Sequence, residues 1–345
     1  MASAPNSRIS TLQAGRGLAA IAVVAFHSFQ YVGRQIAPLP VALAAPMSYG
    51  YLGVDFFFVL SGFIIYFTNH ARASEPDWPA RFLRSRLSRI YLPYWPIAIA
   101  LGVAYMLLPQ VSAGDRPWDW PTTLTLLPIP GGASAHALAW TLQHELVFYM
   151  LALLFLRVRL VLAGAMAAAT AILVAALLGS GRWLAFPLID LEFLFGIGAA
   201  WCVLSGRARH GRLLAAAGLL LASAYIAWND RAFTLLFGLG VALILVPLVR
   251  LEQSGRIAVA KPWVFLGDAS YAIYLIHLPL LSIVVRVARE PLPAAILCIL
   301  ASIAAGAAYH LSIERPLLAW ARARSRRRGD NEAAVQAASS NSSSL

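Results

Sequence analysis

The chain has 345 residues; 60% of them are hydrophobic, only 12% are charged, and the formal net charge is +12. Because soluble domains contain about a quarter charged residues, this composition excludes an ordinary soluble enzyme and predicts a polytopic helical membrane protein. The positive charge does not indicate a nucleic-acid-binding protein, since the arginines mark the topology of the loops. Cys202 and Cys298 both fall in apolar runs and predict neither a disulfide framework nor a metal site.

Apolar runs recur along the chain and predict an all-α bundle of about ten transmembrane helices. The predicted spans are residues 10–31, 48–70, 91–109, 138–156, 160–179, 184–204, 213–228, 232–249, 263–285 and 293–314. With the N-terminus in the cytoplasm, 20 of the 27 basic residues fall in inside segments, so both termini are predicted to be cytoplasmic. We therefore predict a multi-pass domain over residues 1–328, without a cleavable signal peptide, in a bacterial cytoplasmic (inner) membrane. A disordered cytoplasmic tail is predicted over residues 329–345.

The first span contains a cationic and a titratable side chain, Arg16 and His27. Ionisable residues are costly in hydrocarbon and usually face a cavity that serves chemistry or transport. Eleven residues make about three helical turns plus 20°, so both side chains lie on one helix face, roughly 16 Å apart along the axis. Two alternatives stay open: Arg16 is a topology charge at the membrane edge, and His27 is a packed, hydrogen-bonded histidine.

Four further ionisable residues fall at a similar predicted depth to His27: Asp55, Glu145, Glu192 and His277. Counted at 1.5 Å per residue from the predicted outer ends of their spans, the five lie roughly 6 to 12 Å below the outer surface. A shared layer of this kind predicts one water-accessible pocket in the outer half of the bundle.

The inner side is predicted to carry an arginine-rich segment over residues 81–89. Leu83, Leu87 and Ile90 have helical spacing, which predicts an interfacial amphipathic helix. Its four arginines can bind phosphates through forked hydrogen bonds, or they serve only to set the topology and contact lipid headgroups. The four are Arg81, Arg84, Arg86 and Arg89.

Six motifs follow one another in an order that resembles acyltransferase family 3, a family of membrane O-acyltransferases that modify carbohydrates and other hydroxyl acceptors. They are Arg16 and His27 with ten residues between them, and residues 53–63, 84–95, 140–149, 270–279 and 314–316. Many members have two carboxylates where this chain has Glu145 followed by Leu146. The run Gln143-His144-Glu145 is similar to the branch that acylates bacterial exopolysaccharides.

The resemblance implies transfer of an acyl group, usually acetyl, from acyl-CoA to a hydroxyl. It makes His27 the candidate general base and Glu145 the partner that orients its imidazole. Arg16 is then expected to grip the CoA phosphates or to polarise the thioester. The arginines at 81, 84, 86 and 89 are expected to hold the phosphates on the cytoplasmic side. For Glu145, a structural hydrogen bond to a neighbouring helix is the alternative.

Five other residues are candidates for binding the acceptor: Asp55, Tyr271, Tyr274, His277 and Glu192. Helix packing is the alternative for the tyrosines, and an ion pair with Arg16 or His27 is the alternative for Asp55. The expected partners are membrane lipid, a carbohydrate acceptor and acyl-CoA as donor substrate, with no permanently bound cofactor, no metal and no nucleic acid. The identity of the acceptor stays open, because an antibiotic macrolide sugar or a lipid-linked glycan is the alternative to a polysaccharide. The oligomeric state also stays open. A membrane transporter is the rival class.

Overall fold

A computed structural model describes residues 9–108, 117–127, 129, 132–157, 191–206, 210–228, 233–325 and 327. All regular elements in these ranges are helical. They are α1 (Ser10–Gln35), α2 (Val41–Ser48), η1 (Tyr49–Tyr51), α3 (Leu52–Asn69), α4 (Trp78–Leu107), α5 (Trp120–Thr125), α6 (Ala139–Arg157), α8 (Leu191–Leu204), α9 (Gly211–Trp228), α10 (Thr234–Gln253), α11 (Lys261–Val287), α12 (Pro291–Tyr309) and the π-helix η5 (His310–Glu314).

Seven stretches within the described ranges are long and apolar enough to cross a membrane, which confirms the all-α, multi-pass character. They are Ser10–Gln35, Val41–Asn69, Trp78–Leu107, Gly211–Trp228, Thr234–Gln253, Lys261–Val287 and Pro291–Ser325. The span predicted at 160–179 and the tail 329–345 lie outside the described residues, as does the first part of the span predicted at 184–204. The total of about ten spans and the cytoplasmic termini stay predictions.

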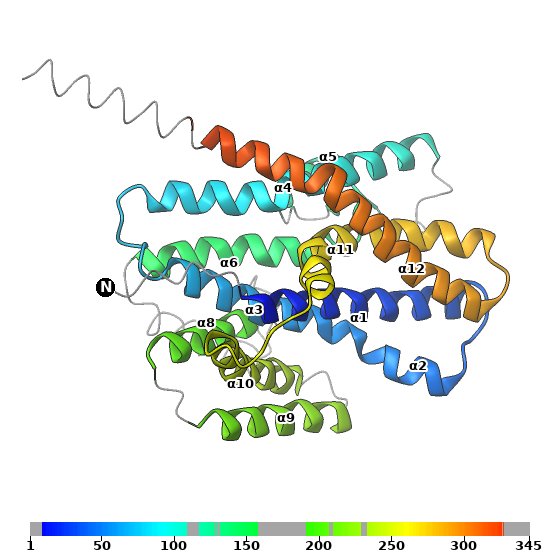
Figure 1. Cartoon of the computed structure of the whole chain (residues 1–345). Helices are drawn as coiled ribbons and strands as arrows, with labels where there is room; N and C mark the ends of the chain where they lie inside the picture. Colours follow the sequence, from blue (N-terminus) through cyan, green and yellow to red (C-terminus); the bar gives the residue numbers. More distant parts are fainter. Residues whose placement is uncertain are drawn as a thin grey trace, which may run out of the picture.

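The connections sort to two ends of the bundle (Figure 1). The α1–α2 and α11–α12 connections lie at one end, on the right of the view, whereas the α3–α4 connection and the end of the C-terminal helix lie at the other. The left end is the arginine-rich one, because α4 begins there and because Arg315 and Arg322 of the C-terminal helix line the same cavity as Arg81 and Arg84 of α4. Five of the basic residues that the sequence pattern assigned to the inner side thus lie together at this end: Arg81, Arg84, Arg89, Arg315 and Arg322.

The segment 81–89 is not a separate interfacial helix, which corrects the sequence prediction. It forms the first part of α4, a single helix of 30 residues that continues through Pro93 and Pro96 and extends about 45 Å. The C-terminal helix is likewise longer than predicted, because it passes through the π-helical turn His310–Glu314 and continues to Ser325. Glu314 is therefore inside a helix instead of at its end.

The connection between α4 and α6 also differs from the predicted outer loop. Its short helix α5 folds back against α4, where Tyr94 donates a hydrogen bond to the Thr123 carbonyl (2.8 Å) and Trp95 donates one to the Leu124 carbonyl (2.9 Å). Thr123 and His136 are fully buried. Because α5 packs against the middle of α4 and not beyond its end, α6 begins deeper than a count from the outer surface assumes.

Close glycine contacts fix the two helix pairs that position the site. A Cβ at Gly17 would lie 2.9 Å from Leu266 of α11, and one at Gly267 would lie 1.9 Å from the Gln13 carbonyl of α1. A Cβ at Gly62 or Gly196 would lie 1.9 or 1.8 Å from a carbonyl of the facing helix, which joins α3 to α8. Small residues allow membrane helices to approach closely, so these pairs have little freedom to slide.

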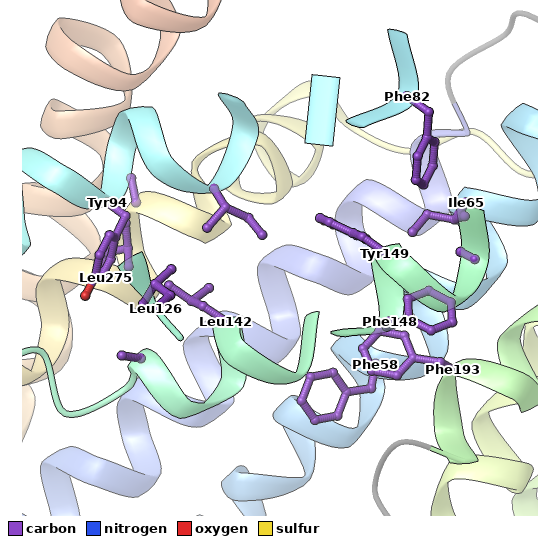
Figure 2. Close-up of a cluster of buried hydrophobic side chains, with 14 of the residues drawn as sticks. Phe58, Ile65, Phe82, Tyr94, Leu126, Leu142, Phe148, Tyr149, Phe193 and Leu275 are labelled. Atoms are coloured by element: carbon purple, nitrogen blue, oxygen red, sulfur yellow. The ribbon is translucent and has the colours of Figure 1, made fainter. Parts of the chain in front are cut away.

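Aromatic side chains form the core between α3, α4, α6 and α8 (Figure 2). Phe148 of α6 stacks on Phe193 of α8 with ring centroids 3.9 Å apart, and Phe58 of α3 packs against Phe193 at 4.8 Å. Tyr149 follows Phe148 on α6 and is also fully buried. This core holds α6 in place, so that Glu145, one turn before Tyr149, projects toward the residues described next.

Candidate active site

Helices α1 and α11 run side by side, and two residues of the first-span motif each contact a residue of the motif at 270–279. Arg16 donates a hydrogen bond from Nε to Ser270 Oγ (3.3 Å), and His27 Nδ1 lies 3.0 Å from His277 Nε2. The sequence separations of these pairs are 254 and 250 residues, which is the register of two parallel helices. Arg16 and His27 therefore both face α11, as their shared helix face predicted.

An inner cavity of about 90 Å³ lies between α1, α3, α4, α6 and α11. Three cations and one carboxylate face a largely apolar wall; the polar and aromatic lining residues are Arg16, Phe57, Phe58, Ser61, Arg86, Arg89, Thr141, Glu145, Tyr149, Ser270, Tyr271 and Tyr274. Glu145 accepts hydrogen bonds from Tyr149 and from Ser61 (3.4 Å). Its charge acts on both Arg16 and Arg86, so Glu145 is the counter-ion of the arginines in this cavity.

A second cavity, of about 580 Å³, opens at the arginine-rich end. It lies between the start of α4 and the C-terminal helix, and its charged lining residues are Arg16, Arg81, Arg84, Arg89, Asp268, His310, Glu314, Arg315 and Arg322. His310 and Glu314 form an ion pair at 2.7 Å across the π-helical turn. Six arginines around one opening favour a ligand that carries several negative charges.

Arg16 and Arg89 line both cavities and therefore lie between them. Arg16 interacts electrostatically with Glu145, which lines the inner cavity, and with Glu314, which lines the larger cavity. A ligand whose charged end occupies the larger cavity would have to extend past these two guanidinium groups to reach the smaller one.

The predicted phosphate-binding arginines separate into two groups. Arg81, Arg84 and Arg89 line the larger cavity, whereas Arg86 lines only the inner one and lies over the rings of Phe82 (5.6 Å) and Tyr149 (5.8 Å). The cause is helical geometry: position 86 points away from the face shared by positions 81, 85 and 88, and so toward α6.

Tyr274 lies between the inner cavity and the histidine pair. It lines the cavity, its hydroxyl is 3.1 Å from Thr141 Oγ1, and its ring is 5.6 Å from that of His277. Tyr271, also on the cavity wall, donates a hydrogen bond to the Ile90 carbonyl (3.0 Å) and so ties α11 to α4. Tyr274 thus connects the inner cavity to the imidazole of His277.

The five residues predicted to share one layer do not share one cavity, which corrects that expectation. His27 contacts His277, Glu145 faces the arginines, and the carboxyl groups of Asp55 and Glu192 face each other between α3 and α8. The depth count failed because α6 begins inside the bundle, so Glu145 lies with Arg16. Gly238 of α10 makes room for Glu192, since a Cβ there would lie 2.7 Å from its Oε1.

The orienting partner of His27 is another point of difference. The structure places His277 against His27, and the contacts of Glu145 are with Tyr149 and Ser61. A direct role of Glu145 in orienting His27 therefore stays a prediction. Sequence reasoning also missed Ser270, Arg315 and His136. The first two lie within the motifs at 270–279 and 314–316, which were the available signal.

Among the described residues, no group of histidine, cysteine and carboxylate side chains is arranged to hold a metal ion. Together the bundle and its charged cavities define a multi-pass helical membrane protein with an internal site. Residues 9–311 match the family model described as an acyltransferase domain, which covers most of the chain. The chain belongs to acyltransferase family 3, whose members are O-acyltransferases.

Two curated relatives are similar to the chain. One is the exopolysaccharide production protein ExoZ of Rhizobium meliloti (strain 1021), which is 29% identical over 320 residues, 80% of this chain and 92% of that protein. The other is protein 2 in the picA locus of Rhizobium radiobacter, 31% identical over 168 residues, 43% of this chain and 82% of that protein. No solved structure matches the chain.

Proposed function

We propose that the protein moves an acyl group, acetyl in the first instance, from cytoplasmic acyl-CoA to a carbohydrate hydroxyl presented from the other side of the membrane. The observation that carries the proposal is the pair of unequal cavities that meet at Arg16 and Arg89. Together with membership of an O-acyltransferase family, this arrangement fits a donor with a bulky polyanionic head and a narrow arm.

Size and charge support the placement of the donor. The larger cavity, about 580 Å³ with six arginines, is within the range of small-molecule sites and suits the CoA phosphates. The inner cavity, about 90 Å³ and mostly apolar, is too small for a nucleotide and would take only the thioester end of the uncharged pantetheine arm. The thioester would then lie near Tyr274, on the side of the histidine pair.

The chemistry requires a base, because a hydroxyl is a poor nucleophile until its proton is removed. We assign this role to His27, because histidine is the side chain that most often serves as a general base. The acceptor oxygen attacks the thioester carbonyl as His27 takes the hydroxyl proton, the C–S bond breaks, and the proton passes to the CoA thiolate. We assign Arg16, which lines both cavities, to binding the phosphates of the donor.

An exopolysaccharide is the acceptor we favour, because a relative that aligns over 80% of this chain is named an exopolysaccharide production protein. An antibiotic macrolide sugar and a lipid-linked glycan are the competing acceptors, and all three present hydroxyl groups. The favoured location is the bacterial cytoplasmic (inner) membrane, where cytoplasmic acyl-CoA and exported glycans are both within reach.

The test is acyl transfer by the purified protein in liposomes, with labelled acetyl-CoA and a panel of the three acceptor types. We expect label on the exopolysaccharide with the wild type and loss of transfer in folded His27→Ala. His70→Ala is the matched control, since His70 is exposed at the end of α3 and should leave transfer unchanged. Label on another member of the panel would identify that compound as the acceptor. Movement of an acceptor across the membrane without consumption of acetyl-CoA would favour a transporter.

A further inference from the structure

The contact between His27 and His277 determines which nitrogen of each ring carries a proton. The two rings lie with centroids 5.1 Å apart, and His27 Nδ1 is 3.0 Å from His277 Nε2. His277 is fully buried, and His27 is half-buried. A hydrogen bond between two nitrogens needs one donor and one acceptor, and a neutral imidazole has one of each.

The carbonyl of Tyr274 settles the state of His277. It lies 2.6 Å from His277 Nδ1, and a carbonyl oxygen can only accept, so Nδ1 must carry the proton of this ring. His277 Nε2 is then the acceptor, and His27 must donate from Nδ1. The remaining nitrogen of His27, Nε2, is left with its lone pair.

We propose that His277 is a positioning residue that holds His27 in the tautomer with its proton on Nδ1, so that Nε2 is free to act as the base. The inference deepens the proposed function and rests on it. In the transfer step the hydroxyl proton moves to His27 Nε2 as the new O–C bond forms and the C–S bond breaks. His27 then passes that proton to the departing thiolate, while its Nδ1–H stays bonded to His277.

The turn of α11 that carries His277 is itself held in place. Pro279 has no N–H, so the carbonyl of Leu275, which would accept from residue 279 in a regular helix, is left open. His136 fills this position, with Nε2 2.8 Å from the Leu275 carbonyl. The buried His136 thus satisfies the open carbonyl beside His277 and fixes the geometry of the pair.

The kinetic test compares two replacements of His277 of similar length. His277→Gln keeps an acceptor where Nε2 lies, whereas His277→Met removes it. We expect His277→Met to lower kcat about 100-fold or more, the lower end of what a general base contributes, with the KM for acetyl-CoA within twofold of wild type. His277→Gln should restore most of the kcat. Equal losses in both variants, or a change confined to KM, would overturn the proposal.

A spectroscopic test separates this inference from the proposed function, because it needs no turnover. In protein labelled with 15N-histidine and held in detergent micelles, the signals of His27 are those absent from His27→Asn. We expect wild-type His27 to be protonated at Nδ1, and His277→Met to show a mixture of tautomers, with His70→Met as the unchanged control. A His27 protonated at Nε2 in the wild type would refute the positioning role whether or not the protein transfers acyl groups.

Discussion

At the scale of single residues, Glu145 balances positive charge that is partly buried. It accepts hydrogen bonds from Tyr149 and Ser61 and acts on Arg16 and Arg86, which line the same cavity. A buried cation that loses its counter-ion is costly, whereas a surface ion pair contributes little. We therefore assign Glu145 a role in holding the arginines in place, in addition to any direct part in the chemistry.

Glu145→Gln keeps the shape of the side chain but removes its charge. We expect it to destabilise the protein by about 1 to 3 kcal/mol, because Arg16 and Arg86 lose the carboxylate that faces them in the inner cavity. Thermal unfolding in detergent micelles would measure the loss. The control is His144→Gln on the preceding residue, which should unfold close to wild type. Equal unfolding temperatures for the two variants would show that Glu145 does not balance the cavity.

At the scale of helices, the larger cavity is built by α4 together with the C-terminal helix. Arg84 of α4 donates a hydrogen bond to Ser325 (3.3 Å), which ties the two helices together at the arginine-rich end. Arg315 and Arg322 extend the set of arginines that the sequence pattern had placed on α4 alone. The continuation of the C-terminal helix past its π-helical turn is what brings them there, and such turns are frequent at functional sites.

Arg315→Gln should therefore weaken donor binding without slowing the chemical step. The loss of one charge-assisted hydrogen bond, about 1.5 kcal/mol, corresponds to a roughly 10-fold rise in the KM for acetyl-CoA. Acetyl-pantetheine, which lacks the nucleotide phosphates, should be used equally well by both proteins. Arg324→Gln is the control on the same helix, since Arg324 packs over Trp320 at 5.4 Å. An unchanged KM in Arg315→Gln would remove Arg315 from the donor site.

The α3–α8 pair offers a sharp test of close packing, because α8 has two glycines in different surroundings. A Cβ at Gly196 would lie 1.8 Å from the Val59 carbonyl, whereas nothing lies within 4 Å of one at Gly198. We expect Gly196→Ala to destabilise the protein by about 1 to 3 kcal/mol and Gly198→Ala to leave it unchanged or slightly more stable. Thermal unfolding of both variants would measure this difference, and equal unfolding temperatures would contradict the close contact between α3 and α8.

Asp119 fastens the folded-back segment between α4 and α6. Its carboxylate accepts hydrogen bonds from the backbone N–H groups of Thr122 (2.6 Å) and Ala133 (2.8 Å). These hydrogen bonds, of which the one from Thr122 has the larger effect, lower the pKa of Asp119 below its ordinary 3.8. Because the folded pKa is the lower one, the carboxylate stabilises the fold above pH 3.8, and this contribution is lost as the pH falls through the folded value.

Asp119→Ala should cost about 1 kcal/mol at neutral pH, the usual effect of losing a helix N-cap. The gap between wild type and variant should narrow as the pH is lowered below 3.8, where the wild-type carboxylate becomes protonated. Unfolding measured across this pH range would show the convergence. A gap that stays constant with pH would mean that the charge of Asp119 does not matter.

Local periodicity predicted the elements better than it predicted their contacts. The shared face of Arg16 and His27 follows from 3.6 residues per turn, and it is found in the structure. The partnership with His277 joins residues 250 positions apart and depends on which helices pack together, which no local pattern reveals. The folded-back α5 escaped prediction because its burial depends on hydrogen bonds from Tyr94 and Trp95 of another helix.

At the scale of the whole molecule, the two ends of the bundle differ in character. One end gathers the arginines of the larger cavity, and the histidine pair lies further along α1 and α11 toward the other. A charged donor cannot cross the bilayer and should have access from the arginine-rich end alone. The proposed reaction thus has a direction that follows from how charge is distributed along the bundle.

This direction can be tested with sealed membranes of defined orientation. Acetyl-CoA added to inside-out vesicles should support transfer, and the same amount added to right-side-out vesicles should not, until a detergent opens them. Arg315→Gln should respond to orientation as the wild type does, at a higher KM. Equal transfer from both orientations would show that the donor enters from either side, and transfer from right-side-out vesicles alone would place the donor site at the opposite end of the bundle.

The two arginines between the cavities also bear on the leakage of protons across the membrane. A protein that admits a donor from one side and an acceptor from the other carries water-filled space deep into the membrane, and such space invites protons to flow. Arg16 and Arg89 place two positive charges at the point where the cavities meet. Fixed positive charge at a constriction repels cations and protons, as it does in water-selective pores. The guanidinium groups that are proposed to pass an acyl donor would therefore also preserve the proton gradient across the membrane.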